Sequence, residues 1–470
     1  MRALLFGATL LAATVFTVSA QAQVPGIPLW PGHQTKGTEA DAWLAYGGDA
    51  QLTNQSDQPT ITAQSAASLH EVWSTQLDGA IAASPLALYG VVYAATENGS
   101  VYAVHGDDGS VIWSHTLPTV ATGDCGTWGI TSTGAIDTAR GLLYVADADG
   151  TVDALSLATG AVVWSVRVST RPDTEYVWGG LRLVGDTLYI PVASYCDEPD
   201  ASGHPAEGHL LALDVASQAF VANFDTVPGP DNLGGVWGWG GVSVEPDGSA
   251  IWTAVGNSVA QNADCGCIVD DVGYGDSVVK LTTDLTPVAS NRPNDVPNVG
   301  DYDFGAAPVL FDVPACGSYA AANNKDGYLY IWKRDALADG PVAEFAIGTR
   351  SGAPFVGQPS WSSSLNVLYD ASTDVPGLGD GVSAVAFTTT CGVRVRWQTA
   401  TGDGTQPPPL VLGDVIFAAG GSSGWSALDA TTGDLLWHEN GDSPTLAPPI
   451  AVDGRIVAGD WGGVLHAFAP

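Results

Sequence analysis

The chain has 470 residues, of which only 14% are charged, and most of the charged residues are acidic. Asp and Glu total 50 against 15 Lys and Arg, which gives a formal net charge of −35. Phosphate backbones and anionic lipid would repel such a chain at long range, so we exclude a nucleic-acid partner. With 45% hydrophobic residues, 58 glycines and 29 prolines, the composition favours many short strands joined by turns.

The first residues have the pattern of a secretory signal. Arg2 precedes an apolar stretch that runs to about Val18, and Ala22 supplies the small residue after which we expect cleavage. No later apolar run reaches the roughly 18 residues of a membrane-spanning helix. We therefore expect a signal peptide over residues 1–22 and a periplasmic or secreted protein without a membrane span.

One sequence pattern recurs along the chain and indicates the fold. Residues 90–117, 141–168 and 414–440 each read as three alternating apolar strands joined by Gly/Asp turns. A tryptophan closes such units at Trp73, Trp113, Trp164, Trp397 and Trp437. The spacing of about 40 to 50 residues is that of a four-stranded propeller blade.

Seven full units and one split unit fit this period. The full units span 80–117, 127–168, 178–226, 239–290, 303–348, 355–399 and 408–440. An eighth unit begins at Leu446 and lacks its fourth strand, whereas residues 71–77 form a fourth strand with no blade in front. Pairing of 71–77 with 463–468 would close the ring and remove an exposed sheet edge. The sequence thus predicts an all-β, eight-bladed propeller of four-stranded antiparallel blades over 67–470, preceded by a lead segment over 23–66; seven blades is the alternative.

The six cysteines, an even number in an exported chain, favour disulfides over metal thiolates. With the blades assigned as above, we predict disulfides Cys125–Cys196 and Cys316–Cys391, each between loops on one face of neighbouring blades. Cys265 and Cys267 would then pair with each other or remain free. The chain has no Cys-x-x-Cys-His sequence, so we expect no covalently held haem.

Propeller geometry also predicts on which face each polar residue lies. One face carries the loops between the second and third strands of each blade, together with the connections between blades. Residues suited to chemistry fall in these loops of the third to fifth units: Glu198, Trp239, Asn257, Asp301, Asp303 and Lys325. Carboxylate and amide oxygens are hard ligands that suit Ca²⁺. Such an ion could polarise a carbonyl as a Lewis acid, while a second carboxylate accepts a proton and a lysine stabilises negative charge on an oxygen.

The phrases DALSLATGAVVW and SALDATTGDLLW resemble the repeat of the pyrroloquinoline quinone (PQQ) dehydrogenase propellers, and the resemblance spans nearly the whole mature chain. DYDFGAAPVLF and NKDGYLYIW are most similar to the polyvinyl alcohol dehydrogenase group of that family. The resemblance implies a quinoprotein that oxidises a small or polymeric alcohol with PQQ and Ca²⁺. Electrons would leave to a separate acceptor such as a cytochrome.

The resemblance also implies roles for single residues. Trp239 would be the floor beneath the quinone and Lys325 the basic residue beside it, while Glu198 and Asn257 would bind Ca²⁺. Asp303 would be the catalytic base. The sequence Asp301-Tyr302-Asp303 admits a second register, in which Asp301 is the base and Asp303 is an extra metal ligand, as in lanthanide-using relatives.

Other interpretations of the same features stay open. The adjacent Cys-Cys pair of many family members is missing, because residues 130–137 read ITSTGAID. An Asp or Asn at a strand end is commonly a turn residue that bonds its own backbone, and Trp239 could be a core aromatic. The same propeller also serves as a cofactor-free scaffold in an outer-membrane assembly factor, so a binding scaffold is the alternative function.

Overall fold

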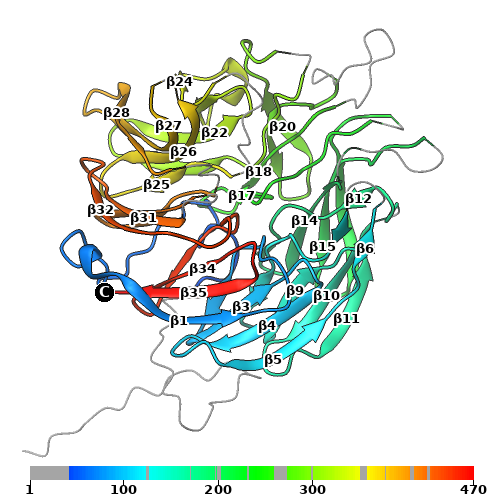
Figure 1. The fold of residues 1–470 in the computed structure, drawn as a ribbon. Coiled ribbons are helices and arrows are strands. Elements are labelled where there is room, and N and C mark those ends of the chain that lie inside the picture. Colours follow the sequence, from blue (N-terminus) through cyan, green and yellow to red (C-terminus); the bar gives the residue numbers. More distant parts are fainter. Residues whose placement is uncertain are drawn as a thin grey trace, which may run out of the picture.

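The computed structural model describes residues 42–470, except 123–125, 170, 196, 198–202, 230–231, 259–271, 298–299, 350–356, 376, 403–406 and 421–423. Eight antiparallel sheets stand around a ring (Figure 1). The described part of the chain holds no α-helix, only 3₁₀ turns at Ala66–Ser68 and Leu337–Asp339. The predicted eight-bladed, all-β propeller is confirmed, and seven blades is wrong. Among these residues, no helix is long and apolar enough to cross a membrane.

The first four blades run from the innermost to the outermost strand as follows. Blade 1 is β2 (Leu86–Leu88), β3 (Val91–Ala95), β4 (Ser100–His105) and β5 (Val111–Thr116). Blade 2 is β8 (Ala135–Asp137), β9 (Leu142–Ala146), β10 (Thr151–Ser156) and β11 (Val162–Arg167). Blade 3 is β13 (Arg182–Val184), β14 (Thr187–Ser194), β15 (His209–Asp214) and β16 (Ala219–Asp225), with β12 (Glu175–Tyr176) also paired to β14. Blade 4 is β17 (Ser243–Val244), β18 (Ala250–Ala254), β19 (Val278–Thr282) and β20 (Pro287–Asn291).

The other four blades complete the ring. Blade 5 is β21 (Val309–Val313), β22 (Gly317–Asn324), β23 (Tyr328–Lys333) and β24 (Ala343–Ala346). Blade 6 is β25 (Ser360–Ser362), β26 (Val367–Val375), β27 (Gly379–Phe387) and β28 (Val393–Ala400). Blade 7 is β29 (Leu410–Leu412), β30 (Val415–Gly420), β31 (Gly424–Asp429) and β32 (Leu435–Glu439). Blade 8 is β33 (Ile450–Val452), β34 (Arg455–Gly459), β35 (Val464–Ala469) and β1 (His70–Gln76), while β6 (Val120–Ala121) and β7 (Thr127–Trp128) form a separate hairpin.

The two ends of the propeller domain close the ring in blade 8. Strand β1 pairs antiparallel with β35, from His70 opposite Ala469 to Gln76 opposite Val464. Figure 1 shows the two strands side by side, blue against red. The predicted closure between the chain termini is confirmed, and it leaves β1 rather than β35 as the outer strand of this blade.

Indole rings join several blades to their neighbours. The Trp73 Nε1 donates to the Gly106 carbonyl at 2.9 Å, and the ring lies on Gly109 of the next blade's outer turn. A Cβ added to Gly109 would lie 2.5 Å from the ring, so only glycine permits this approach. Equivalent pairs are Trp113 with Gly160 and Trp397 with Gly433. The recurring Trp and Gly of the sequence are therefore the two halves of one contact between blades.

The segment before β1 is part of the same fold. Backbone hydrogen bonds link Trp43 to Ala87, Leu44 to Ile136, Ala50 to Val244, Gln51 to Leu310, Thr53 to Trp361 and Asn54 to Val411. The Arg182 side chain donates to the Tyr46 carbonyl at blade 3. These partners lie on the innermost strands of blades 1 to 7 in chain order. The segment therefore contacts seven blades in turn before β1 completes the eighth.

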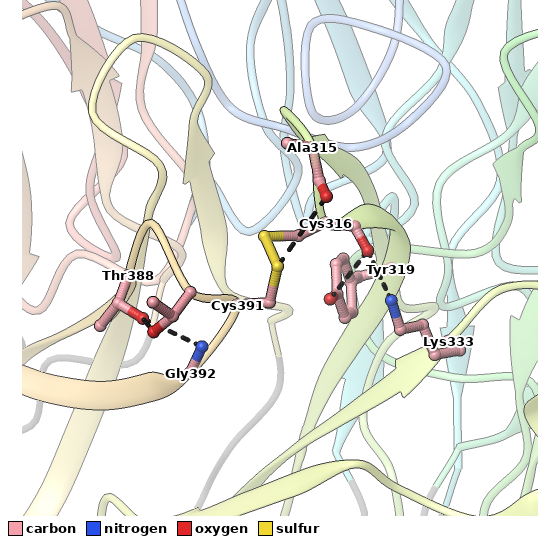
Figure 2. The surroundings of a disulfide bond; sticks show 8 residues. Ala315, Cys316, Tyr319, Lys333, Thr388, Cys391 and Gly392 are labelled. Atoms are coloured by element: carbon pink, nitrogen blue, oxygen red, sulfur yellow. Dashed lines mark hydrogen bonds between the residues drawn. A yellow bond between two sulfur atoms is a disulfide. The ribbon is translucent and has the colours of Figure 1, made fainter.

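The disulfide Cys316–Cys391 is confirmed, with its Cα atoms 5.4 Å apart. It joins the β21–β22 turn of blade 5 to the β27–β28 turn of blade 6, and Lys333 and Tyr319 donate to the Cys316 carbonyl beside it (Figure 2). Cys125, Cys196, Cys265 and Cys267 lie outside the described residues, so their pairing stays a prediction.

Candidate functional site

Loops that follow the second strands of blades 3, 4 and 5 meet the connections between these blades at a cavity of about 180 Å³. Three of the residues expected at this mouth line the cavity, namely Asn257, Asp303 and Lys325. The other residues that line it are Trp178, Ala193, Ser194, Tyr195, Asp197, Gly235, Trp237 and Gly256. Residues from separate blades thus converge at one place, and Glu198 lies outside the described residues.

A lysine and two carboxylates form the charged part of the site. The Lys325 Nζ lies 2.7 Å from an Asp301 oxygen and 2.9 Å from Asp303 Oδ1. The Asp303 side chain is 2% exposed, whereas that of Asp301 is 53% exposed. Burial raises the pKa of Asp303 to about 6, although the positive charge of Lys325 opposes the shift. The two aspartates therefore differ in environment, because Asp303 is enclosed and Asp301 faces solvent.

The lysine keeps its proton in this environment. Burial alone would lower the pKa of Lys325, but the charges of Asp303 and Asp301 overcome that effect and raise it. Lys325 also lies over an aromatic ring, 4.4 Å from the centroid of Trp237. An ammonium in this position is stabilised by the two carboxylates and by the negative face of the indole.

Trp237 lines the cavity, whereas Trp239, the predicted floor beneath a quinone, is not among the residues that line it. Trp237 lines the cavity and donates from Nε1 to Asp303 Oδ2 at 2.8 Å. Trp239 is buried against Tyr46 and Ala307 and donates to the Ala82 carbonyl at 2.9 Å. The role of Trp239 as a cofactor platform therefore stays a prediction.

Asn257 presents an oxygen that no described residue uses. Its backbone N–H donates to Asp303 Oδ2 at 3.3 Å, and its Nδ2 donates to the Gly300 carbonyl at 3.3 Å. Within the described part of the chain, Oδ1 is therefore left as an acceptor. Amide and carboxylate oxygens are ligands that Ca²⁺ takes, usually six to eight at a time.

The described residues supply only part of such a ligand set. Outside the gaps, no group of three or more His, Cys, Asp or Glu side chains is placed to hold a metal. A cation bound here would use Asn257 Oδ1 and would need further ligands from outside these residues.

Aromatic side chains that the sequence analysis missed form one wall of the cavity. Trp178 meets Trp237 edge-on, with the ring centroids 6.2 Å apart. Tyr195 stacks on Tyr176 at 4.6 Å and packs against Trp128. The cluster EYVWGG before β13 was a visible signal, but its composition alone does not separate a cavity wall from a blade core.

Comparison with known proteins gives the family. A family model described as outer membrane protein assembly factor BamB, of the PQQ-repeat type, matches residues 16–220 and 355–470. The chain belongs to this family. It is 22% identical to a polyvinylalcohol dehydrogenase of Sphingopyxis sp. (strain 113P3), over 92% of this chain and 71% of the relative. The resemblance inferred from the repeats is thus confirmed.

Two solved structures show the same fold. A quinohemoprotein alcohol dehydrogenase ADHIIG from Pseudomonas putida HK5 matches with a TM-score of 0.75 and 16% identity, over 95% of this chain and 83% of that protein. A europium-containing methanol dehydrogenase matches with a TM-score of 0.72 and 15% identity, over 92% of this chain and 99% of that protein. At these identities the likeness extends to the fold alone.

Proposed function

We propose that the protein is a quinoprotein dehydrogenase that oxidises an alcohol and holds PQQ at the cavity between blades 3 and 5. The observation that carries the proposal is the buried Asp303 carboxylate between the Lys325 ammonium and the Trp237 indole, because it joins a base, a cation and an aromatic surface in one place. The curated relative adds support, since its name is that of an alcohol-oxidising enzyme.

When bound, PQQ supplies a quinone that accepts two electrons from the alcohol. Asp303 accepts the hydroxyl proton of the alcohol, and its pKa of about 6 leaves it ionised but still basic near neutral pH. Lys325 remains charged and stabilises negative charge on an oxygen brought beside it. Trp237 offers a flat apolar surface next to both groups.

The metal in this proposal is Ca²⁺, with Asn257 Oδ1 and Glu198 as ligands. A lanthanide is the alternative, in which Asp301 takes the role of base and Asp303 becomes a ligand. The enclosure of Asp303 and its bond to Trp237 favour the first assignment, because a proton is best moved where solvent is excluded. We further propose that the protein is periplasmic or secreted, acts on a small or polymeric alcohol, and delivers electrons to a separate acceptor such as a cytochrome.

The test is uptake of PQQ by the purified protein, followed with and without added Ca²⁺ or La³⁺. The proposal expects metal-dependent binding and reduction of an electron-accepting dye when an alcohol is added. Asp301→Asn and Asp303→Asn then decide which carboxylate is the base. A protein that binds no PQQ with either metal contradicts the proposal and favours the scaffold function that the description of the matching family names.

A further inference from the structure

One indole ring contacts both charged partners of the site. The Trp237 Nε1 donates to Asp303 Oδ2 at 2.8 Å, and the Lys325 Nζ lies 4.4 Å from the ring centroid. We propose that Trp237 is a positioning residue, which fixes the orientation of the Asp303 carboxylate through its indole N–H. The inference rests on the proposed function, because it assigns Trp237 a part in the proton transfer to Asp303.

The hydrogen bonds of Asp303 explain why one donor matters. Oδ2 accepts from the Trp237 indole at 2.8 Å and from the Asn257 backbone N–H at 3.3 Å, while Oδ1 faces the Lys325 ammonium at 2.9 Å. The terminal torsion of an aspartate has broad, roughly two-fold preferences, so only such contacts hold the carboxylate in one orientation. Loss of the indole donor leaves Oδ2 with the longer bond to Asn257 alone.

Gly256 keeps the indole and the carboxylate in contact. A Cβ at this position would lie 2.8 Å from Asp303 Oδ2 and 2.9 Å from Trp237 Nε1. No real Cβ tolerates such distances, so alanine at 256 would push the carboxylate and the indole apart. The backbone of Gly256 is not left-handed, and alanine there adds this collision without backbone strain. Gly256→Ala is therefore a second way to break the same hydrogen bond.

Trp239 supplies a matched control two residues along the chain. Its indole also donates a buried hydrogen bond, but to the Ala82 carbonyl, and it does not line the cavity. Trp239→Phe removes an indole N–H from the protein, as Trp237→Phe does. The two variants differ in whether Asp303 loses a donor.

The contact itself is tested without cofactor, from the indole N–H resonances of the ¹⁵N-labelled protein. Trp237→Phe assigns the Trp237 signal by its disappearance, and Trp239→Phe assigns the Trp239 signal. We expect Asp303→Asn and Gly256→Ala to shift the Trp237 signal and to leave that of Trp239 in place. A Trp237 signal that neither variant moves overturns the inference.

The role is tested with PQQ and Ca²⁺ added to folded variants. We expect Trp237→Phe and Gly256→Ala to lower kcat about tenfold, the effect of losing one hydrogen bond to a charged group, with KM and the Kd for PQQ within about twofold of the parent. Trp113→Phe removes an indole N–H that donates to the Leu157 carbonyl away from the cavity, and it should keep the parent kcat. An active parent with unchanged kcat in both variants overturns the positioning role alone, whereas a parent that takes up no PQQ overturns the proposed function and the role together.

Discussion

Two parts of the ring are held together in different ways. From blade 8 to blade 2, and again from blade 6 to blade 7, an indole on an outer strand lies on a glycine of the next blade, as Trp73 does on Gly109. In blades 3, 4 and 6, the corresponding turn positions hold Gln218, Leu285 and Cys391, all with left-handed φ values. The cavity belongs to the second part, in blades 3 to 5.

The difference shows which blades of the repeat can carry a functional site. Where the Trp and Gly contact recurs, the sequence of each blade is constrained by its neighbour. In blades 3 and 4, where the contact is replaced, the loops after the second strands are longer than in blades 1 and 2 and carry side chains that line the cavity. The regular part should then supply closure and stability, while the irregular part supplies chemistry.

Removal of the closing strand should have the largest effect. Deletion of residues 70–76 leaves β35 (Val464–Ala469) without its partner and exposes an unpaired edge. We expect aggregation and loss of the monomer, measured by size-exclusion chromatography and thermal melting. A truncated protein that stays monomeric and melts at the parent temperature contradicts closure by β1.

The chemistry of the irregular part should depend on Asp303. Asp303→Asn keeps the shape of the side chain but cannot accept a proton, so turnover with PQQ and alcohol should fall by about 10²–10⁴. Lys325 keeps its ion pair with Asp301, so the variant leaves no buried charge alone and should stay folded. PQQ uptake should be nearly that of the parent. An active Asp303→Asn beside an inactive Asp301→Asn would move the base to Asp301.

The regular part could be predicted from the sequence because its signals are periodic. The tryptophans that recur about every 40 residues mark the contacts between blades, and the missing fourth strand at the C-terminus marks the closure. Cys316 and Cys391 were paired correctly because both turns belong to one face of adjacent blades. Asn257 and Lys325 were placed at the mouth because they follow strand ends.

The rest of the site could not be predicted for physical reasons. Trp237 and Trp239 are separated by one glycine, and nothing in the sequence tells which of the two rings meets Asp303. Trp178 looks like a core aromatic in the sequence. The path of residues 43–56 around seven blades depends on single backbone bonds, which have no periodicity to detect.

The disulfide should stabilise the junction of blades 5 and 6. There Cys391 occupies the turn position that glycine holds in the regular blades. It closes a separation of 75 residues, and such a loop is worth about 4 kcal/mol in the free energy of unfolding. We expect a Cys316→Ser and Cys391→Ser double variant to lose up to this amount in denaturant titrations. Reducing agent should lower the stability of the parent by more than that of the variant, which keeps the predicted Cys125–Cys196 disulfide. Equal stability of the parent and the variant would show that packing alone holds this junction.

Closure at blade 8 should carry a small pH dependence. His466 lies 2.6 Å from Glu71 of β1 and 3.4 Å from Asp460. Burial alone would lower the pKa of His466, but hydrogen bonds to these carboxylates raise it. The stabilisation is fully present below the ordinary His pKa of about 6.5 and is lost as the pH rises through the raised value.

The variant that checks this is His466→Gln. Its free energy of unfolding should fall below that of the parent at about pH 6, by no more than about 1 kcal/mol, and the gap should close at alkaline pH. His209→Gln, which removes a similar histidine between Glu175 and Asp225 in blade 3, separates an effect of closure from one of any buried histidine. A gap for His466→Gln that is constant with pH would exclude this ion pair as its cause.

The smallest effect tests the left-handed turns themselves. Gln218 is exposed, has a φ of 58°, and stands at the turn position that glycine occupies in the regular blades. A non-glycine residue in this region costs roughly 1–2 kcal/mol of folding free energy. Glycine removes this cost, but about half of the gain is lost again because glycine has greater freedom in the unfolded chain. Gln218→Gly should therefore raise the free energy of unfolding by about 0.5 kcal/mol. Leu285 has the same backbone with a φ of 61°, but its side chain is 2% exposed, so Leu285→Gly should destabilise through lost burial. If both variants destabilise the protein equally, backbone strain is not what distinguishes the turns of the irregular part.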